Sequence, residues 1–501
     1  MNREIATPRR TAAAQTLATG IRRAAIANLG CKVNQSEMDD VERLLRSRGI
    51  ELVGADDAAD VVVVNTCTVT STADRKSRQA IRRARRASPN ALVMITGCTA
   101  TVDPAAIARL DPRALVFDNK AKSRLAVELG RLLDLPPDRA MPTVSGVEVA
   151  QVPKRARARR SAAPSIEPSA EPEGARVFEV EPEADDFAES IDRTRAFIKI
   201  QDGCSFHCTY CIIPRARGPE RSVPAKVVVA EVQKAIAAGH REVVLTGINA
   251  GTYDDRGVNL SQLVRRILDR TKIERIRLSS IEPQHVTDQL LYTWTGSDGR
   301  CLPHFHVPLQ SGDDTILRRM GRRYTTDDYR NLAGRIREAM PDASLHADLI
   351  AGFPGEDDDS WARTMAFLRE LSLAGIHVFR YSARPGTPAA RMVAQVDGRT
   401  RKARSAEALA LAAEARATFA RRQNDRELSV LFEQALPGAR WIGHAENYVL
   451  VTVFTPNGPT LENVIAKVRA VTIDPAHRDR VVGRIVSIAP ARERLARGRA
   501  K

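Results

Sequence analysis

The chain has 501 residues, about three times the usual length of a single domain, which predicts roughly three domains and not one core. Its 43% hydrophobic and 28% charged residues are typical of globular proteins and exclude a wholly disordered or collagen-like chain. Lysine and arginine number 77 against 61 acidic residues, and the net charge of +16 favours a polyanionic partner such as nucleic acid.

No apolar run approaches the roughly 20 residues that cross a bilayer. The first residues lead into an Ala/Thr-rich stretch and not into the apolar core of a signal peptide. We therefore expect a cytoplasmic protein without a membrane partner. Seven cysteines are too few for a disulfide scaffold, so free thiols or metal ligands are expected.

Short apolar runs alternate with helical patterns from about residue 22 to residue 135, after a segment, 1–21, that we expect to be disordered. This alternation is typical of βαβ units and predicts an N-terminal doubly wound parallel-sheet domain. The predicted strands are residues 24–30, 61–66 and 91–97, and the predicted helices are residues 37–49 and 75–88.

Cys31, Cys67 and Cys98 each follow a different predicted strand of this domain. The carboxyl ends of parallel strands meet at one edge, so the three thiols are expected to converge there. Three soft ligands favour an iron–sulfur or zinc site. The alternative is that each cysteine is a small buried apolar residue.

Residues 136–194 are rich in Pro, Ala, Ser and charge, with a basic block before an acidic one. Such a segment cannot bury enough apolar surface to offset its ordering entropy. It is predicted to be a disordered linker.

The next domain, predicted at 195–424, opens with a strand that leads into Cys204, Cys208 and Cys211 in a Cys-x3-Cys-x2-Cys loop. Three thiolates so closely spaced can hold three irons of a four-iron cluster and leave the fourth iron without a protein ligand. A structural zinc site normally needs four ligands, and His207 is the alternative fourth ligand here.

Six βα units follow from this strand onward, which predicts a partial, six-stranded parallel barrel. The polar motifs of this region fall after the predicted strands. Catalytic groups of such barrels lie on the loops after the strand ends.

The segments LGCKVNQSE, VVNTCTVT, ITGC, QDGCSFHCTYCIIPRARG, PLQSGDD, IAGFPGE and YSARPGTPAA occur in this order. Together they resemble the methylthiotransferase family of radical S-adenosylmethionine enzymes. Within that family, CKVNQ and QDGC are most similar to the branch that acts on N6-threonylcarbamoyladenosine at position 37 of tRNA. The sister branches, which act on N6-isopentenyladenosine in tRNA or on an aspartate of a ribosomal protein, are the alternatives.

The resemblance implies two [4Fe-4S] clusters, one held by Cys204, Cys208 and Cys211 and an auxiliary one held by Cys31, Cys67 and Cys98. It also implies S-adenosylmethionine as a cofactor, reductively cleaved at the first cluster so that a methylthio group enters C2 of the adenosine. A reduced electron donor such as flavodoxin or ferredoxin is implied as a partner, and the sequence does not identify the sulfur donor. The alternative outside this class is a non-catalytic iron–sulfur protein that binds RNA.

Position along the barrel suggests further contacts for the cofactor or the nucleoside. Gly247 and Asn249 correspond to the superfamily segment that meets the methionine amino group. The other predicted contacts, at later strand ends, are Ser280, Glu282, Gln310, Ser311 and Asp348. Turn formation, helix capping and loop hydrogen bonding are the alternative roles of these residues.

Short strands with turn signals at 425–490 predict a small C-terminal β-barrel, followed by a basic tail at 491–501. This region resembles the TRAM domain, an RNA-binding module, which implies contact with the anticodon loop of tRNA. Its aromatic residues Trp441, Tyr448 and Phe454 either stack on bases or pack in the core.

Overall fold

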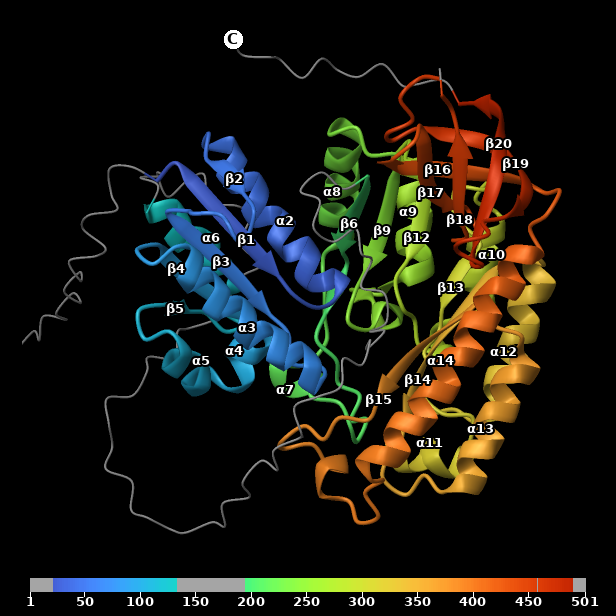
Figure 1. Cartoon of the computed structure of the whole chain (residues 1–501), viewed down its shortest axis with the longest axis horizontal. Coiled ribbons are helices and arrows are strands. Elements are labelled where there is room, and N and C mark those ends of the chain that lie inside the picture. Colours follow the sequence, from blue (N-terminus) through green and yellow to red (C-terminus); the bar gives the residue numbers. More distant parts are fainter. Residues whose placement is uncertain (1–20, 133–193, 457, 490–501) are drawn as a thin grey trace, which may run out of the picture.

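The computed structural model describes residues 21–132, 194–456 and 458–489. Figure 1 shows an N-terminal sheet domain in blue, a central barrel domain in green to orange, and a small C-terminal barrel in red. The segments predicted to be disordered (1–21 and 136–194) lie outside the described residues, except for their end residues 21 and 194, and so does the predicted basic tail at 491–501. Among the described helices, none is both long and apolar enough to cross a membrane.

The N-terminal domain is a five-stranded parallel sheet in the order β2-β1-β3-β4-β5. Helices α2 and α6 pack on one face and α3 and α5 on the other, which confirms the doubly wound sheet. The run Val61–Thr66 is buried throughout because helices cover both of its faces. Strands β2 and β5, at the two edges, were not predicted.

The elements of this domain are β1 (Arg23–Asn28), α2 (Lys32–Ser47), β2 (Glu51–Val53), β3 (Val61–Thr66), α3 (Ser71–Ala87), β4 (Leu92–Gly97), α4 (Cys98–Val102), α5 (Pro104–Leu110), β5 (Leu115–Val116) and α6 (Lys122–Leu132).

The central domain contains two three-stranded parallel sheets, β12-β9-β6 and β13-β14-β15. A parallel bridge between Ile276 and Cys301 links them, which confirms a partial barrel of six parallel strands. Apolar side chains of the strands and of the surrounding helices form one continuous core, in which Cys301 is buried.

The elements of the central domain are β6 (Arg195–Lys199), β7 (Gln201–Asp202), α7 (Ile213–Arg217), β8 (Arg221–Ser222), α8 (Ala225–Ala237), β9 (Glu242–Thr246), η2 (Ala250–Thr252), β10 (Asp254–Asp255), β11 (Val258–Asn259), α9 (Leu260–Arg270), β12 (Arg275–Leu278), η3 (Pro283–His285), α10 (Asp288–Thr295), β13 (His304–His306), α11 (Asp314–Met320), α12 (Thr326–Ala339), β14 (Ser344–Ala351), α13 (Asp358–Leu371), β15 (Gly375–Arg380), η4 (Ala389–Arg391) and α14 (Gly398–Arg421).

The N-terminal domain contacts both strands that flank the open side of the partial barrel. On one side, Lys199 of β6 forms an ion pair with Glu37 of α2, with 3.1 Å between Nζ and Oε1. On the other side, the backbone N–H of Ser71 donates to the hydroxyl of Ser382, just after β15, over 3.0 Å. The domain therefore spans the gap between β6 and β15.

The C-terminal domain is a closed five-stranded barrel in the order β16-β17-β18-β20-β19. Its pairings are antiparallel except for the parallel pair β18–β20. Its strands are β16 (Glu427–Leu436), β17 (Arg440–Ala445), β18 (Leu450–Phe454), β19 (Ile465–Ile473) and β20 (Arg480–Ile488).

Two buried arginines of β12 attach this barrel to the central domain. Arg275 donates to the carbonyl of Ser429 over 2.9 Å, and Arg277 donates to the carbonyl of Ala445 over 2.7 Å. The carboxylate of Glu242, fully buried between the two guanidinium groups, pairs with each of them at 2.7 Å. The two barrels are thus joined through charge-assisted hydrogen bonds that are sheltered from solvent.

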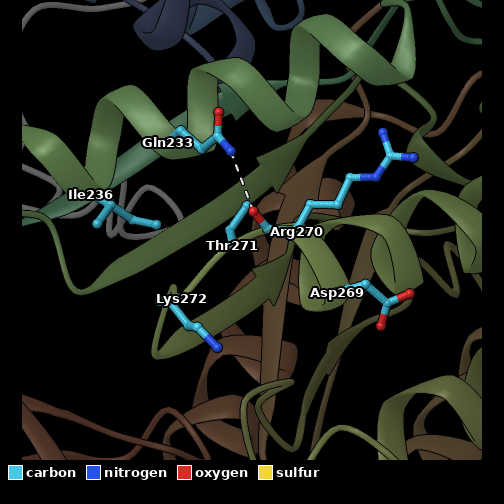
Figure 2. A pocket seen from close by; sticks show the side chains of 6 residues that line it. All are labelled: Gln233, Ile236, Asp269, Arg270, Thr271 and Lys272. Carbon is cyan, nitrogen blue, oxygen red and sulfur yellow. Dashed lines mark hydrogen bonds between the residues drawn. The ribbon is translucent and has the colours of Figure 1, made fainter.

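A cavity of about 310 Å³ lies on the outer surface of the central domain, between α8 and the end of α9 (Figure 2). Gln233 spans it and donates to the carbonyl of Arg270 over 3.3 Å. Both helices end there and lead into the first residues of β9 and β12. This cavity is therefore at the opposite end of the barrel from the cysteine loop that follows β6.

Candidate active site

The central cysteines lie on the loop between β7 and α7, at the carboxyl end of the first barrel strand. The backbone N–H of Cys211 donates to the carbonyl of Cys208 over 3.0 Å, and the N–H of Phe206 faces the sulfur of Cys204 over 3.4 Å. All three cysteines are partly exposed. The backbone N–H of Phe206 thus already points at a thiol that would carry negative charge as a metal ligand.

Arg322 places a positive charge next to this loop, although it lies more than a hundred residues after Cys208 in the chain. Its Nη1 faces the sulfur of Cys208 at 3.3 Å and the hydroxyl of Tyr210 at 3.4 Å, and its other terminal nitrogen pairs with Glu282. Burial raises the pKa of Cys211 to about 12, with its neighbour thiols adding to the shift and Arg322 opposing it. The loop therefore favours a bound cation over three free thiolates.

Gly247 and Asn249, predicted to meet S-adenosylmethionine, follow β9 beside this loop. A Cβ on Gly247 would lie 3.0 Å from the side chain of Gln201, which is tighter than an ordinary van der Waals contact, so glycine suits this close approach. The backbone N–H of Asn249 donates to the side-chain oxygen of Gln201 over 2.9 Å. The side-chain amide of Asn249 is buried, and neither its oxygen nor its nitrogen has a hydrogen-bond partner among the described residues. A buried amide in this state fits a ligand that supplies the missing partners.

The other predicted contacts differ in their surroundings. Glu282 pairs with Arg322, as described above, and burial raises its pKa despite that pair. Gln310 has the left-handed backbone conformation, with φ of 70°, and its N–H donates to the carbonyl of Asp348 over 2.8 Å. Ser311 faces Thr364 of α13, with 3.3 Å between the hydroxyls, so its side chain serves the packing of an outer helix.

Ser280 is half-buried beyond the end of β12, whereas Asp348 lies inside β14. The Oδ1 atom of Asp348 lies 2.7 Å from Nε2 of His306 in β13, which is a hydrogen-bonding distance. His377 of the adjacent β15 joins them, and the ligand atoms of the three residues lie within 4.8 Å of one another. Side chains of three neighbouring strands therefore form one polar cluster.

The N-terminal cysteines lie at the ends of three neighbouring strands, as predicted. Two glycines with positive φ bring these ends together. A Cβ on Gly30 would lie 3.0 Å from the sulfur of Cys67, and a Cβ on Gly97 would lie 2.2 Å from the carbonyl oxygen that precedes Cys67. Cys31 is the N-cap residue of α2 and is exposed, whereas Cys67 and Cys98 are buried. Burial raises the pKa of Cys67 to about 12, and the thiol of Cys98 adds to the shift.

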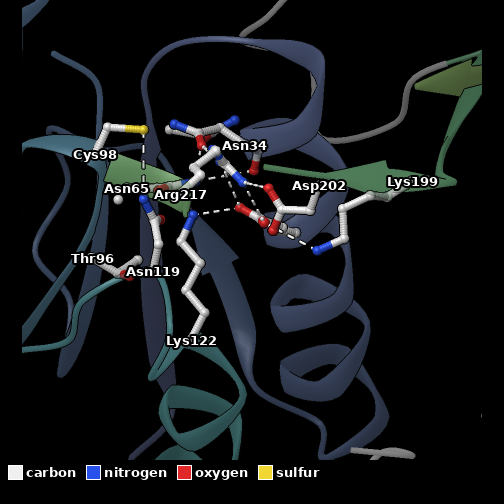
Figure 3. Close-up of polar contacts among 12 residues, drawn as sticks. Asn34, Asn65, Thr96, Cys98, Asn119, Lys122, Lys199, Asp202 and Arg217 are labelled. Atoms are coloured by element: carbon white, nitrogen blue, oxygen red, sulfur yellow. Dashed lines mark hydrogen bonds and ion pairs between the residues drawn. The ribbon is translucent and has the colours of Figure 1, made fainter. Parts of the chain in front are cut away.

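A buried polar network joins the N-terminal cysteines to the central domain (Figure 3). Asn119 donates to the carbonyl of Ala216 in α7 over 2.8 Å and faces the sulfur of Cys98 at 3.6 Å. Arg217, also in α7, pairs with Glu37 of α2 at 3.1 Å and with Asp202 at 2.7 Å. The two cysteine loops are therefore held to each other by direct contacts between the domains.

The charge of this network fits an anionic metal group next to it. Three cationic side chains face two carboxylates, and all five are at most partly exposed. The cations are Arg217, Lys122 and Lys199, and the carboxylates are Glu37 and Asp202. An excess of buried positive charge is costly unless a negative partner is near. A four-iron cluster bound by three thiolates carries net negative charge and supplies that partner.

Unpartnered polar atoms surround the same place. The side-chain oxygens of Asn65, Thr96 and Asn119 are buried and have no hydrogen-bond partner within the part of the chain that the structure describes. Figure 3 shows these side chains gathered near Cys98. Buried polar atoms are normally satisfied, so their state fits a site completed by a bound group or by water.

The fold and the site define a radical S-adenosylmethionine enzyme: a partial parallel barrel carries a three-cysteine loop at the carboxyl end of its first strand. Residues 198–368 match the radical SAM superfamily, and residues 23–118 match the uncharacterized protein family UPF0004.

The chain is 35% identical to the threonylcarbamoyladenosine tRNA methylthiotransferase MtaB of Bacillus subtilis, over 85% of this chain and 89% of that protein. It is equally 35% identical to the Aquifex aeolicus protein of the same name, over 81% of this chain and 92% of that protein. The tRNA-2-methylthio-N(6)-dimethylallyladenosine synthase of Maricaulis maris is 30% identical, over 93% and 98%. The chain belongs to the tRNA methylthiotransferase family, whose cofactors are S-adenosylmethionine and two [4Fe-4S] clusters.

Sequence reasoning missed several residues of the site. Arg217 carried a local signal, because it follows the cysteine loop within the segment IIPRARG. Arg322 and Asn119 had none, since each is brought to its cysteine by tertiary packing, across 114 and 21 residues of the chain respectively.

Proposed function

We propose that this protein methylthiolates C2 of N6-threonylcarbamoyladenosine at position 37 of tRNA. Support comes from the relatives of that name, which match most of this chain at 35% identity. The observation that carries the proposal is the pair of cysteine triads on two domains joined through Arg217 and Asn119. A radical-forming site and a sulfur-donating site must lie close together for one nucleoside to meet both.

In this proposal Cys204, Cys208 and Cys211 hold the radical SAM cluster. Cys31, Cys67 and Cys98 hold the auxiliary cluster. When bound, these cofactors supply reductive cleavage of S-adenosylmethionine and a sulfur that becomes the methylthio group. Three cysteines in each triad would hold three irons of a four-iron cluster and would leave the fourth iron without a protein ligand.

The protein's own side chains bind and orient the reactants. Arg322 places a positive charge beside Cys208 and fixes the carboxylate of Glu282. The unpartnered amide of Asn249 is positioned to hold a polar group of S-adenosylmethionine. The N-terminal domain spans the open side of the barrel and restricts access of water from that side.

The C-terminal barrel is assigned to tRNA binding. Phe454 is 64% exposed, and Arg440 lies opposite it in the register of β17 and β18. An exposed ring beside a cation is suited to stacking on an unpaired base of the anticodon loop. We infer that the enzyme works in the cytoplasm, where tRNA is modified, with flavodoxin or ferredoxin as its reductant.

The test is mass spectrometry of tRNA nucleosides from cells that lack the protein. We expect the 2-methylthio form of N6-threonylcarbamoyladenosine to disappear and its unmodified precursor to accumulate. The Maricaulis maris relative favours the second candidate, an enzyme for the dimethylallyl nucleoside. Loss of the methylthiolated dimethylallyl nucleoside, with the threonylcarbamoyl form unchanged, would establish that candidate instead.

A further inference from the structure

Arg217 lies between the two cysteine loops and contacts the domain to which it does not belong. It follows Cys211 by six residues, yet its guanidinium donates to Asn34 and pairs with Glu37 in the N-terminal domain. Asn34 is three residues beyond Cys31. The side chain of Arg217 has no solvent exposure, so these contacts are made away from water. One side chain therefore fixes the Cys31 loop against the central domain.

The contacts of Arg217 lead directly to the other two N-terminal cysteines. Asn34, to which Arg217 donates, itself donates to the carbonyl of Thr66, the residue before Cys67, over 3.3 Å. Ala216, the residue before Arg217, accepts from Asn119, which faces the sulfur of Cys98 at 3.6 Å. At the other triad, Arg322 faces the sulfur of Cys208 at 3.3 Å. Each triad thus has its own buried arginine, and both arginines belong to the central domain.

We propose that Arg217 is a positioning residue that also raises the reduction potential of the cluster bound by Cys31, Cys67 and Cys98. The inference rests on the proposed assignment of that cluster. Reduction adds negative charge to a cluster, and a nearby buried cation stabilises the reduced form. The potential of the auxiliary cluster is then set from outside the domain that supplies its ligands.

The surrounding charges do not cancel this effect. Glu37 is shared among Arg217, Lys122 and Lys199, and Asp202 is the second carboxylate, so positive charge remains in excess. Arg384 is another cation near Cys67, but it is only half-buried, whereas the side chain of Arg217 has no solvent exposure. We expect Arg217 to make the larger contribution because its charge is least screened.

The experiment measures the auxiliary cluster alone, in full-length protein in which Cys204, Cys208 and Cys211 are replaced by alanine. The anaerobically reconstituted protein is titrated electrochemically and followed by electron paramagnetic resonance. Into this background we introduce Arg217→Gln, Arg217→Lys and, as a matched control, Arg215→Gln. Arg215 is on the same helix but exposed, with Nη1 on the carbonyl of Pro385 over 3.0 Å.

Arg217→Gln is expected to lower the reduced-to-oxidised ratio at a fixed potential about tenfold, a shift of about 59 mV for a one-electron couple. Arg217→Lys keeps the charge but loses the fork, so its potential should stay near that of the background protein while thermal stability falls. Arg215→Gln should change neither. Equal reduction potentials for the Gln and Lys variants would show that Arg217 only holds the two domains together, and would overturn the inference.

A variant of opposite sign guards against a failure of Arg217→Gln to fold. Glu37→Gln removes a carboxylate from the same network and is expected to raise the potential, which loss of packing alone does not do. An unchanged or lowered potential in Glu37→Gln would overturn the inference. If the background protein binds no cluster before any change at these positions, the assignment of the N-terminal triad fails, and the inference fails with it.

Discussion

The ring of Tyr448, in the C-terminal barrel, stacks on the imidazole of His304 at the first residue of β13, with ring centroids 4.2 Å apart and ring planes 19° from parallel. The guanidinium of Arg277 lies over the same phenol ring at 5.0 Å. Tyr448 has a φ of 71°, in the tight turn between β17 and β18. The C-terminal barrel thus closes the amino end of the central barrel with an aromatic side chain.

Replacing Tyr448 by alanine is expected to lower the free energy of unfolding by about 3 kcal/mol, because the ring is lost from a packed interface and leaves a cavity. Chemical unfolding followed by circular dichroism measures this change. Phe454→Ala is the control, and it should leave stability within about 0.5 kcal/mol because that ring is largely exposed. Equal stability of the two variants would contradict the interface role of Tyr448.

Phe454→Ala should weaken binding of the unmodified tRNA by roughly ten-fold, since the stacking of one base on an aromatic ring contributes about 1–3 kcal/mol. Filter binding at one fixed salt concentration measures the affinity. Tyr448→Ala, compared under conditions where it remains folded, should bind tRNA with nearly normal affinity. If Tyr448→Ala weakened tRNA binding more than Phe454→Ala did, the assignment of the RNA-binding surface to Phe454 would be wrong.

Cys67→Ala is expected to abolish methylthiolation while 5′-deoxyadenosine formation persists, because the radical-generating cluster is assigned to the other domain. The two products are measured by liquid chromatography and mass spectrometry in anaerobic assays with tRNA and reductant. Cys301→Ala is the matched control, since Cys301 is buried in the barrel core away from both triads. Loss of both products in folded Cys67→Ala protein would contradict the division of labour between the triads.

Stability should depend on pH through His377. Burial, with His306 nearby, lowers the pKa of His377 from 6.5 to about 4. Between these two pKa values the unfolded chain binds a proton at His377 and the folded protein does not. The free energy of unfolding is therefore highest above about pH 6.5, and it decreases as the pH falls toward 4. The slope is about 1.4 kcal/mol per pH unit within that window.

His377→Asn should therefore lose less stability than the parent protein between pH 7.5 and pH 5.5 in thermal unfolding. The exposed His477, replaced in the same way, serves as the control and should keep the parental dependence. An unchanged pH dependence in His377→Asn would show that other groups carry it.

The sequence predicted what depends on local pattern and on the geometry of parallel sheets. The cysteines at 31, 67 and 98 follow three apolar runs, and parallel strands bring their carboxyl ends to one edge, where the structure has them. The alternation of strands and helices likewise predicted the six-stranded partial barrel. The edge strands β2 and β5 were not predicted, because runs of three and two residues carry no periodic signal.

The sequence could not predict the contacts that long-range packing creates. Glu37 and Arg217 are 180 residues apart, on different domains, and no pattern in either segment indicates that the two side chains meet. Nor did the sequence distinguish Tyr448, which packs on His304, from Phe454, which faces solvent. Strand alternation gives the face of a side chain, but not which domain covers that face.

The most direct test of the account is the iron and sulfide content of the anaerobically reconstituted full-length protein, with Mössbauer spectroscopy to identify the clusters. We predict about eight irons and eight sulfides per chain in two four-iron clusters. About four of each should remain when either triad, Cys31, Cys67 and Cys98 or Cys204, Cys208 and Cys211, is replaced by alanine. A single four-iron cluster in the unaltered protein, or zinc in place of iron, would contradict the account.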